Sequence, residues 1–237
     1  MLLLAIDTTT TVCSVALGEK DKLWAEITTN TKKTHSQRLM PAVQALLREA
    51  GVDKKQLQGI VVAHGPGSFT GIRIGMATAQ GLAQGLDIPM AGVMTLDALA
   101  EGCAFASGLI CPLLDARREQ VYTCFYRGGT RGPQAMGPPE ALSLDELITK
   151  AKDFGDDVIF TGDALGLFRK KLRAALGTSY SEAPFASRLN RAALVLQKGH
   201  RDWEKVGPVP AYELKPFYIR LPEAERRLRE QRRGQKE

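Results

Sequence analysis

The segment over residues 60–86 constrains the fold more than any other part of the chain. An apolar run of strand type, Ile-Val-Val-Ala, leads into a Gly65-Pro66-Gly67 turn, and a helix is expected from residue 70 to residue 86. Ser68 stands where a helix N-cap belongs, because its hydroxyl can accept a hydrogen bond from a free amide of the first turn. The segment therefore predicts a strand, a tight turn and a helix in direct succession.

The expected helix is unusually poor in bulky side chains. Its small residues recur at four-residue spacing on one face, as Gly71, Gly75, Ala79 and Ala83. Each glycine inside a helix destabilises it by about 1 kcal/mol relative to alanine. Two roles could explain why the glycines are present: they allow a phosphate to approach, or they allow a second helix to pack closely. The segment lacks both the G-x-x-x-x-G-K-[ST] and the complete G-x-G-x-x-G pattern, and Pro66 removes an amide that a phosphate would need. Close packing is therefore favoured.

The first half of the chain shows the periodicities of a mixed sheet with helices. Strands are expected over residues 2–6, 12–18, 22–29, 57–63 and 88–93, and helices over residues 35–50, 70–86 and 96–106. Three strands in a row argue against a Rossmann domain, which crosses over through a helix after its first strand. Pro41 lies inside the helical pattern of residues 35–50 and predicts a kink or a late start.

A fainter copy of this order follows. Residues 109–114 are an apolar run into Asp115 with alternation at 121–126, much as residues 2–6 lead into Asp7 and the strand after it. Residues 127–141 are expected to be irregular, and a capping box at residues 143–146 indicates the start of a helix. A strand is expected at residues 157–161, followed by helices near residues 165–176 and 189–205. The repetition predicts a duplicated ribonuclease-H-like α/β fold of two lobes, each a mixed sheet flanked by helices. The lobes are expected at residues 1–107 and 108–222, with a basic tail at 223–237.

The composition is that of an ordinary globular protein, with 44% hydrophobic and 24% charged residues among 237. No apolar run approaches the roughly 18–20 residues that a membrane span needs, and residues 1–6 lack the basic start of a signal peptide. The four cysteines show no C-x-x-C spacing and lie in apolar segments, as buried thiols in a reducing compartment do. We therefore expect a cytoplasmic protein without a membrane contact.

The net charge of +6 raises the question of nucleic-acid binding. Residues 223–237 hold six basic residues against four glutamates, so this tail supplies +2 of the total. It lacks a clear apolar face and is expected to be flexible. The remaining charge is spread over the rest of the chain with few aromatic residues among the basic ones. This pattern favours a solvated surface and leaves a weak RNA contact as the alternative.

Five motifs together strongly resemble the TsaB (YeaZ) family. They are Leu4-Ala-Ile-Asp-Thr-Thr9, His35-Ser-Gln-Arg-Leu-Met-Pro41, Gly65-Pro-Gly-Ser-Phe-Thr-Gly-Ile-Arg73, Asp115-Ala-Arg117 with Val121-Tyr122, and Pro216-Phe-Tyr-Ile-Arg220. The resemblance extends over residues 2–225 and implies an actin/Hsp70/sugar-kinase-like fold. It also implies a role in forming threonylcarbamoyladenosine beside the anticodon of tRNAs that read codons beginning with A. In that family the chain is a partner of the catalytic subunit TsaD and acts together with the ATPase TsaE.

The residues of this chain agree with a non-catalytic role. A TsaD-like subunit holds its metal with a His-x-x-x-His pair, whereas no two of His35, His64 and His200 lie within 25 residues of each other. Actin-like ATPases also use a first-strand aspartate for magnesium and an Asp-x-Gly loop for phosphate. Asp7 and Thr8 retain the look of the first element, but residues 115–117 lack the glycine that lets backbone amides approach a phosphate. We interpret Asp7 as a cap of its own threonine-rich turn and, with Thr8, as a nucleotide-binding relic.

We therefore expect an accessory subunit without a cofactor of its own, with ATP and metal held by the partner subunits. Its partners would be a TsaD-like catalytic subunit, a TsaE-like ATPase, tRNA through the complex, and a second copy when it is free. The helices over residues 35–50 and 68–86 are expected to form the partner surface. The predicted contact residues are Ser68, Phe69, Thr70, Gly71, Ile72, Arg73, Gly75, Met76, Ala79, His35, Leu39 and Val43. The alternatives are a stand-alone ATP-dependent kinase-like phosphotransferase of the same fold, or a regulatory peptidase that acts on its partner.

Overall fold

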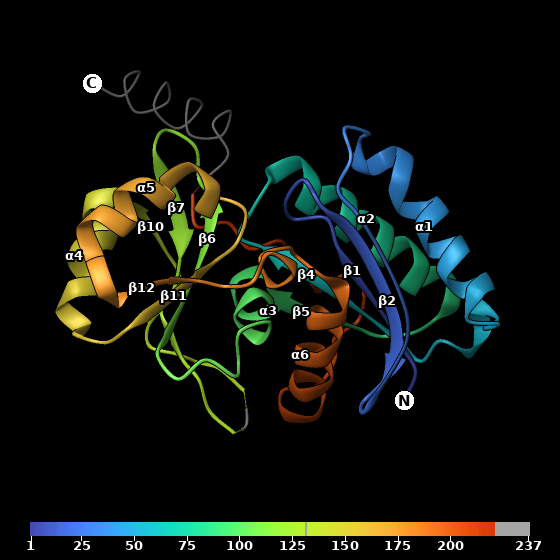
Figure 1. Ribbon diagram of the computed structural model, residues 1–237. Coiled ribbons are helices and arrows are strands. Elements are labelled where there is room, and N and C mark those ends of the chain that lie inside the picture. The colour runs from blue at the N-terminus through green and yellow to red at the C-terminus, as the bar shows by residue number, and fades with distance from the viewer. Residues whose placement is uncertain (131, 221–237) are drawn as a thin grey trace, which may run out of the picture.

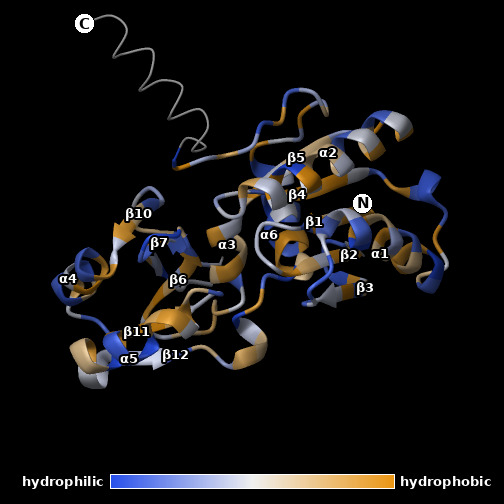
Figure 2. Ribbon diagram, turned by 90° about the horizontal axis from the view of Figure 1, so that it is seen from above, coloured by the Kyte–Doolittle hydropathy of each residue, from blue (hydrophilic) through white to orange (hydrophobic). Residues whose placement is uncertain are grey.

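The computed structural model describes residues 1–130 and 132–220, so the tail expected at residues 223–237 lies outside the described residues. The chain folds into two α/β lobes that lie side by side (Figure 1). Figure 2 shows the same arrangement from above, with α1 (His35–Glu49) and α4 (Leu144–Phe154) at opposite outer edges. The predicted fold class is confirmed.

The first lobe is built on a five-stranded mixed sheet in the order β3-β2-β1-β4-β5. The strands are β1 (Leu3–Asp7), β2 (Cys13–Glu19), β3 (Lys22–Thr29), β4 (Gly59–Gly65) and β5 (Met90–Met94). The first three pair antiparallel, whereas β4 is parallel to β1 and β5 is parallel to β4. Helices α1 and α2 (Phe69–Leu86) cover one face, where Leu39, Val43 and Ile72 join the apolar side chains of the sheet in one core.

The second lobe repeats this topology. Its main sheet has the order β10-β7-β6-β11-β12, with antiparallel pairs on one side of β6 and parallel pairs on the other. The strands are β6 (Leu109–Asp115), β7 (Gln120–Thr123), β10 (Glu140–Ser143), β11 (Val158–Thr161) and β12 (Tyr180–Glu182), and the short β8 (Tyr126–Arg127) and β9 (Gln134–Ala135) extend it. Helices α4 and α5 (Leu165–Leu176) pack on its outer face. The duplication inferred from the sequence is thus present in the order and direction of the strands.

A central layer of two helices lies between the sheets (Figures 1 and 2). Helix α3 (Thr95–Glu101) packs against β6, and α6 (Ala192–Lys205) packs against β1, β2 and β5. The contact of α6 with β4 is very close, since a Cβ added at Gly199 would lie 2.4 Å from Val61. One face of the first sheet is therefore covered by a helix from the second half of the chain. The expected division of the chain into lobes at residue 107 stays a prediction.

The described chain ends in an extended segment, residues 206–220, which we call the C-terminal strap. Val209 forms a β-bridge to Met90 at the edge of the first sheet. The side-chain amide of Gln80 donates to two strap carbonyls, those of Ala211 at 2.9 Å and Leu214 at 3.0 Å. Three 3-10 turns, Lys54–Gln56, Gly177–Ser179 and Phe185–Ser187, complete the secondary structure of the described residues. Within residues 1–130 and 132–220 no helix is both long and apolar enough to cross a membrane.

Several local expectations differ from the structure. Helix α1 begins at His35 and continues through Pro41, so of the two expectations, a kink or a late start, the late start is wrong. Pro41 and Gln37 are both exposed, and water can replace the missing hydrogen bond. The segment at 127–141 is not wholly irregular, because it holds β9 and the start of β10. Helix α6 begins three residues later than expected, and α3 ends five residues earlier. All four cysteines are free and buried, as expected.

Candidate functional site: the interlobe cleft

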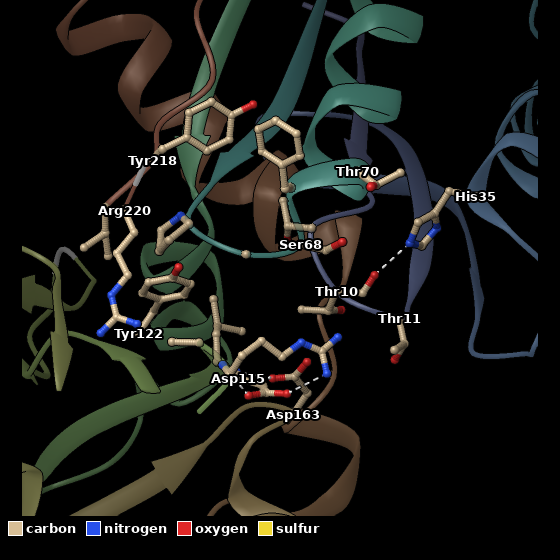
Figure 3. A pocket seen from close by; sticks show the side chains of 18 of the residues that line it. Thr10, Thr11, His35, Ser68, Thr70, Asp115, Tyr122, Asp163, Tyr218 and Arg220 are labelled. Carbon is tan, nitrogen blue, oxygen red and sulfur yellow. Dashed lines mark hydrogen bonds and ion pairs between the residues drawn. The ribbon is translucent and has the colours of Figure 1, made fainter. Parts of the chain in front are cut away.

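A cleft of about 980 Å³ opens between the two lobes (Figure 3). The first lobe contributes the Thr9–Thr11 turn, the loop before α1 and the start of α2, and the second lobe contributes the end of β6, the following turn and Tyr122. Strap residues 217–220 form a further wall. Figure 3 shows Tyr218, Tyr122 and Arg220 on one side and Thr10, Thr11 and His35 on the other, with Asp115 and Asp163 below.

Asp7 does not reach this cleft, because its carboxylate is used inside the protein. It is fully buried. Its Oδ1 accepts hydrogen bonds from the amide of Thr9 at 2.9 Å and the hydroxyl of Thr9 at 2.7 Å, and its Oδ2 accepts one from Asn190 at 3.2 Å. Burial raises the pKa of Asp7 above its ordinary value, against the effect of these bonds. The geometry is that of a turn cap rather than of a magnesium ligand.

The glycines of α2 allow a close approach, but to a turn of this same chain. A Cβ at Gly71 would lie 2.1 Å from the carbonyl oxygen of Thr8, and one at Gly75 would lie 2.3 Å from the Thr8 hydroxyl. The Thr8 hydroxyl donates to the carbonyl of Gly71 at 2.7 Å. The predicted N-cap is present, since the Ser68 hydroxyl accepts from the Gly71 amide at 3.3 Å. The first turn of α2 thus rests on the threonine turn and fills the space beside it.

The twelve predicted contact residues fall into two groups. Seven of them lie in the interior of the first lobe: Leu39, Val43, Gly71, Ile72, Gly75, Met76 and Ala79. The other five reach the surface, namely Ser68, Thr70 and Arg73, which are exposed, and His35 and Phe69, which are half-buried. All of these five except Arg73 line the cleft. The side chain of Arg73 lies over the Phe69 ring at 3.9 Å and donates to the hydroxyl of Tyr218 at 3.2 Å.

The histidines hold the backbone in place. Nε2 of His35 donates to the carbonyl of Thr10 at 2.7 Å, and Arg38 beside it donates to the carbonyls of Thr11 and Thr29, each at 3.0 Å. Burial lowers the pKa of His35 and of His64, so the neutral imidazole is favoured at both. No cluster of three or more possible metal ligands occurs among the described residues.

The second-lobe wall carries two carboxylates. The Asp115 amide donates to Oδ1 of Asp163 at 3.3 Å, and the Asp115 carboxylate accepts from the Arg117 amide at 2.7 Å and pairs with its guanidinium at 3.2 Å. Desolvation raises the pKa of Asp163 to about 6; the charge of the Asp115 carboxylate adds to this increase, and the hydrogen bond from the Asp115 amide opposes it. Ala116 and Arg117 both line the cleft, so side chains stand where a phosphate loop requires glycine.

The sequence did not single out several residues of the cleft and of the threonine turn beside it. Asn190 is separated from Asp7 by 183 residues, and nothing in the local pattern connects the two. Tyr122, Tyr218 and Arg220 belong to motifs of the family resemblance, but those motifs gave them no role. Lys32 and Lys33, on the loop before α1, belong to no motif that would set them apart in the sequence.

The topology and the cleft define a protein of the duplicated ribonuclease-H-like class. A family model described as "TsaD: tRNA N6-adenosine threonylcarbamoyltransferase" matches residues 22–215. The chain is 36% identical over 225 residues to the tRNA threonylcarbamoyladenosine biosynthesis protein TsaB of Bacillus subtilis, covering 95% of this chain and 96% of that one. It is 37% identical over 228 residues to the TsaB of Haemophilus influenzae, covering 93% and 94%.

Solved structures agree with these matches. A Pseudomonas aeruginosa protein described as similar to peptidase YeaZ superposes with a TM-score of 0.76 at 29% identity, covering 92% of this chain and 99% of that one. Component A of (R)-2-hydroxyglutaryl-CoA dehydratase from Acidaminococcus fermentans shares the fold alone, with a TM-score of 0.50 at 11% identity over 85% of this chain and 98% of that one. The chain belongs to the TsaB (YeaZ) family.

Proposed function

We propose that this chain is a non-catalytic subunit in the formation of threonylcarbamoyladenosine in tRNA, and that it binds and activates a TsaD-like transferase. Relatives of nearly the same length carry the name tRNA threonylcarbamoyladenosine biosynthesis protein TsaB. The match to a TsaD model over residues 22–215 supports a common fold for the two subunits. In this proposal ATP and metal belong to the TsaD-like subunit and to a TsaE-like ATPase.

The chemistry of the cleft carries the non-catalytic part of the proposal. The first-strand aspartate, Asp7, is buried and accepts from Thr9 and Asn190 through both carboxylate oxygens. The second loop offers Ala116 and Arg117 in place of glycine, and Arg117 is paired with Asp115. A nucleotide would therefore find neither an open carboxylate on the first strand nor a free phosphate loop on the second lobe.

The partner surface follows from the exposed side of α2, which packs beside α1 (Figure 1). Ala77, Gly81 and Gly85 are exposed at four-residue spacing, and a Cβ at either glycine would have no atom within 4 Å. Packing within this chain does not account for these two glycines, each of which costs about 1 kcal/mol in a helix. A partner helix that approaches closely would account for them. The neighbouring α1 adds the exposed apolar side chain of Met40, and the same surface is open to a second copy of the free chain.

The test is a pull-down of a TsaD-like protein by the substituted chain. Gly81→Leu should weaken capture of the partner by about ten-fold or more, which corresponds to about 1.4 kcal/mol. Gly166→Leu is the matched control, because Gly166 is also exposed, helical and open, but lies on α5 of the second lobe. Both variants should fold, since leucine favours a helix over glycine. Equal capture by both variants would contradict the proposed surface.

A second experiment tests the role. Threonylcarbamoylation of tRNA by the TsaD-like and TsaE-like proteins should depend on the addition of this chain, whereas the chain alone should give no turnover. Calorimetry of the isolated chain with magnesium-ATP should give no binding heat. Magnesium-dependent ATP hydrolysis by the isolated chain would instead favour the kinase-like phosphotransferase, and cleavage of the partner would favour the peptidase.

A further inference from the structure

We propose that the interlobe cleft binds the phosphate backbone of an RNA strand. The inference deepens the proposed function and rests on it for the choice of RNA among polyanions, because it gives this subunit its own contact with RNA. It starts from the charge of the cleft. Six cationic side chains line it, against the two carboxylates of Asp115 and Asp163. The cations are Lys32, Lys33, Arg38, Arg117, Arg118 and Arg220.

The cations come from four separate parts of the chain. They lie on the loop before α1, on α1 itself, on the turn after β6 and on the strap, so both lobes contribute. Lys32 and Lys33 are exposed, and neither makes a hydrogen bond or an ion pair within residues 1–130 and 132–220. A cleft lined by one predominant sign of charge concentrates ligands of the opposite sign. The two lysines are therefore the cations most available to a ligand.

The distribution favours a strand over a single nucleotide. A nucleotide needs its phosphates gathered at one loop, but the Thr8–Thr9 turn is covered by α2, and its amide at Thr9 already donates to Asp7. The cations instead line walls of the cleft that belong to different segments. Successive phosphates of a strand can each meet one of them, while the hydroxyls of Thr10, Thr11 and Ser68 can donate to phosphate or ribose oxygens.

Aromatic side chains lie among these cations. Phe69, Tyr122, Phe217 and Tyr218 all line the cleft. Tyr122 is half-buried on the second lobe, and the rings of Phe69 and Tyr218 are 5.2 Å apart. Single-stranded nucleic acids bind through this combination of a basic groove and rings on which bases stack. The linear sequence hides it, since Phe69 and Tyr218 are far apart in the chain and meet only in the fold.

The experiment measures binding of the full chain to a fluorescent anticodon stem-loop RNA by anisotropy across a salt series. Lys32→Ala with Lys33→Ala should weaken binding by about ten-fold at low salt. It should also reduce the slope of log K against log salt by about 1.4, since each single-strand phosphate contact contributes about 0.7. The matched control is Lys54→Ala with Lys55→Ala, which removes the same charge from an exposed turn after α1. The control should change neither quantity beyond a small general effect.

A third variant tests stacking. Tyr122→Leu keeps an apolar side chain at a half-buried position and should weaken binding several-fold with an unchanged salt slope, because stacking releases no counterion. Three results would overturn the inference: no measurable RNA binding at low salt, equal losses in the two lysine pairs, or displacement of the RNA by magnesium-ATP.

The failure of this inference and that of the proposed function can be told apart. The Lys32/Lys33 variant should still capture the TsaD-like partner, and Gly81→Leu should still bind the RNA. If Gly81→Leu loses partner capture and the chain does not bind RNA, the proposed function is supported and the RNA-binding cleft is contradicted. If the chain binds RNA but does not capture the TsaD-like partner, the RNA-binding cleft is supported and the proposed function is contradicted.

Discussion

Asp163 is the titratable group that the fold changes most at the cleft. Desolvation raises its pKa from the ordinary value of 3.8 to about 6, against the hydrogen bond from the Asp115 amide, which lowers it, and with a smaller increase from the charge of the Asp115 carboxylate. The folded state therefore retains a proton at a pH where the unfolded chain has lost it. The stability contributed by this proton is complete below the unfolded pKa and is lost as the pH rises through about 6.

Asp163→Asn should accordingly stabilise the protein at neutral pH. The asparagine oxygen can still accept from the Asp115 amide, while the unfavourable charge is removed. The shift corresponds to nearly 3 kcal/mol for a fully desolvated carboxyl group. Asp163 lines the open cleft and is exposed to solvent there, so its desolvation is incomplete and the expected gain is about 1 kcal/mol at about pH 8. Urea unfolding should show that this gain largely disappears by about pH 4. An equal difference between variant and wild type at both pH values would contradict the assignment.

The sequence predicted the local half of the threonine turn and missed the other half. An aspartate followed by threonines indicates a side chain that accepts from the amide two residues on, and Asp7 does this with Thr9. The donor to its second oxygen is Asn190, which precedes α6 in the second half of the chain. Such a contact depends on the arrangement of whole elements, so a local pattern cannot reveal it.

At the scale of elements, α2 carries glycines in two kinds of surroundings. Four-residue spacing predicted the close packing of a second helix at Gly71 and Gly75. This prediction is wrong, because the neighbour at both glycines is the Thr8 turn of the same chain, which spacing alone could not identify. Gly81 and Gly85 face open space. The strands β10 and β12 were missed because neither contains the apolar run that revealed the equally short β11: β10 reads Glu-Ala-Leu-Ser and β12 reads Tyr-Ser-Glu.

The two kinds of glycine predict opposite effects of the same substitution. Gly71→Ala should lower the free energy of unfolding by about 2 kcal/mol or more, because its Cβ would lie 2.1 Å from the backbone oxygen of Thr8 and force α2 to shift. Gly81→Ala should raise it by about 1 kcal/mol, because alanine favours the helix and meets no atom within 4 Å. Denaturant unfolding of the two variants checks both signs. Two changes of the same sign would show that the helix packs differently.

At the scale of the molecule, the sequence predicted the duplication of the topology but not which of the two sheets α6 covers. Apolar runs into Asp7 and into Asp115 indicated two copies of one topology, and both sheets have the same order and strand directions. The amphipathic pattern of α6 predicts a helix with one apolar face but not the sheet it covers. In the fold, Ala192, Val195 and Leu196 join the core of the first lobe.

The last prediction follows from this crossing. A fragment of residues 1–107 should not fold by itself, since removal of α6 exposes the face of the first sheet that holds Leu3, Ala5 and Val61. The fragment should unfold without a cooperative transition in urea, whereas the control of residues 1–220 should unfold like the full chain. Addition of residues 186–220 as a second polypeptide should restore a cooperative transition, because this segment supplies both α6 and the strap that pairs with Met90. A cooperative transition of residues 1–107 alone would mean that the first lobe is stable without the helix from the second half.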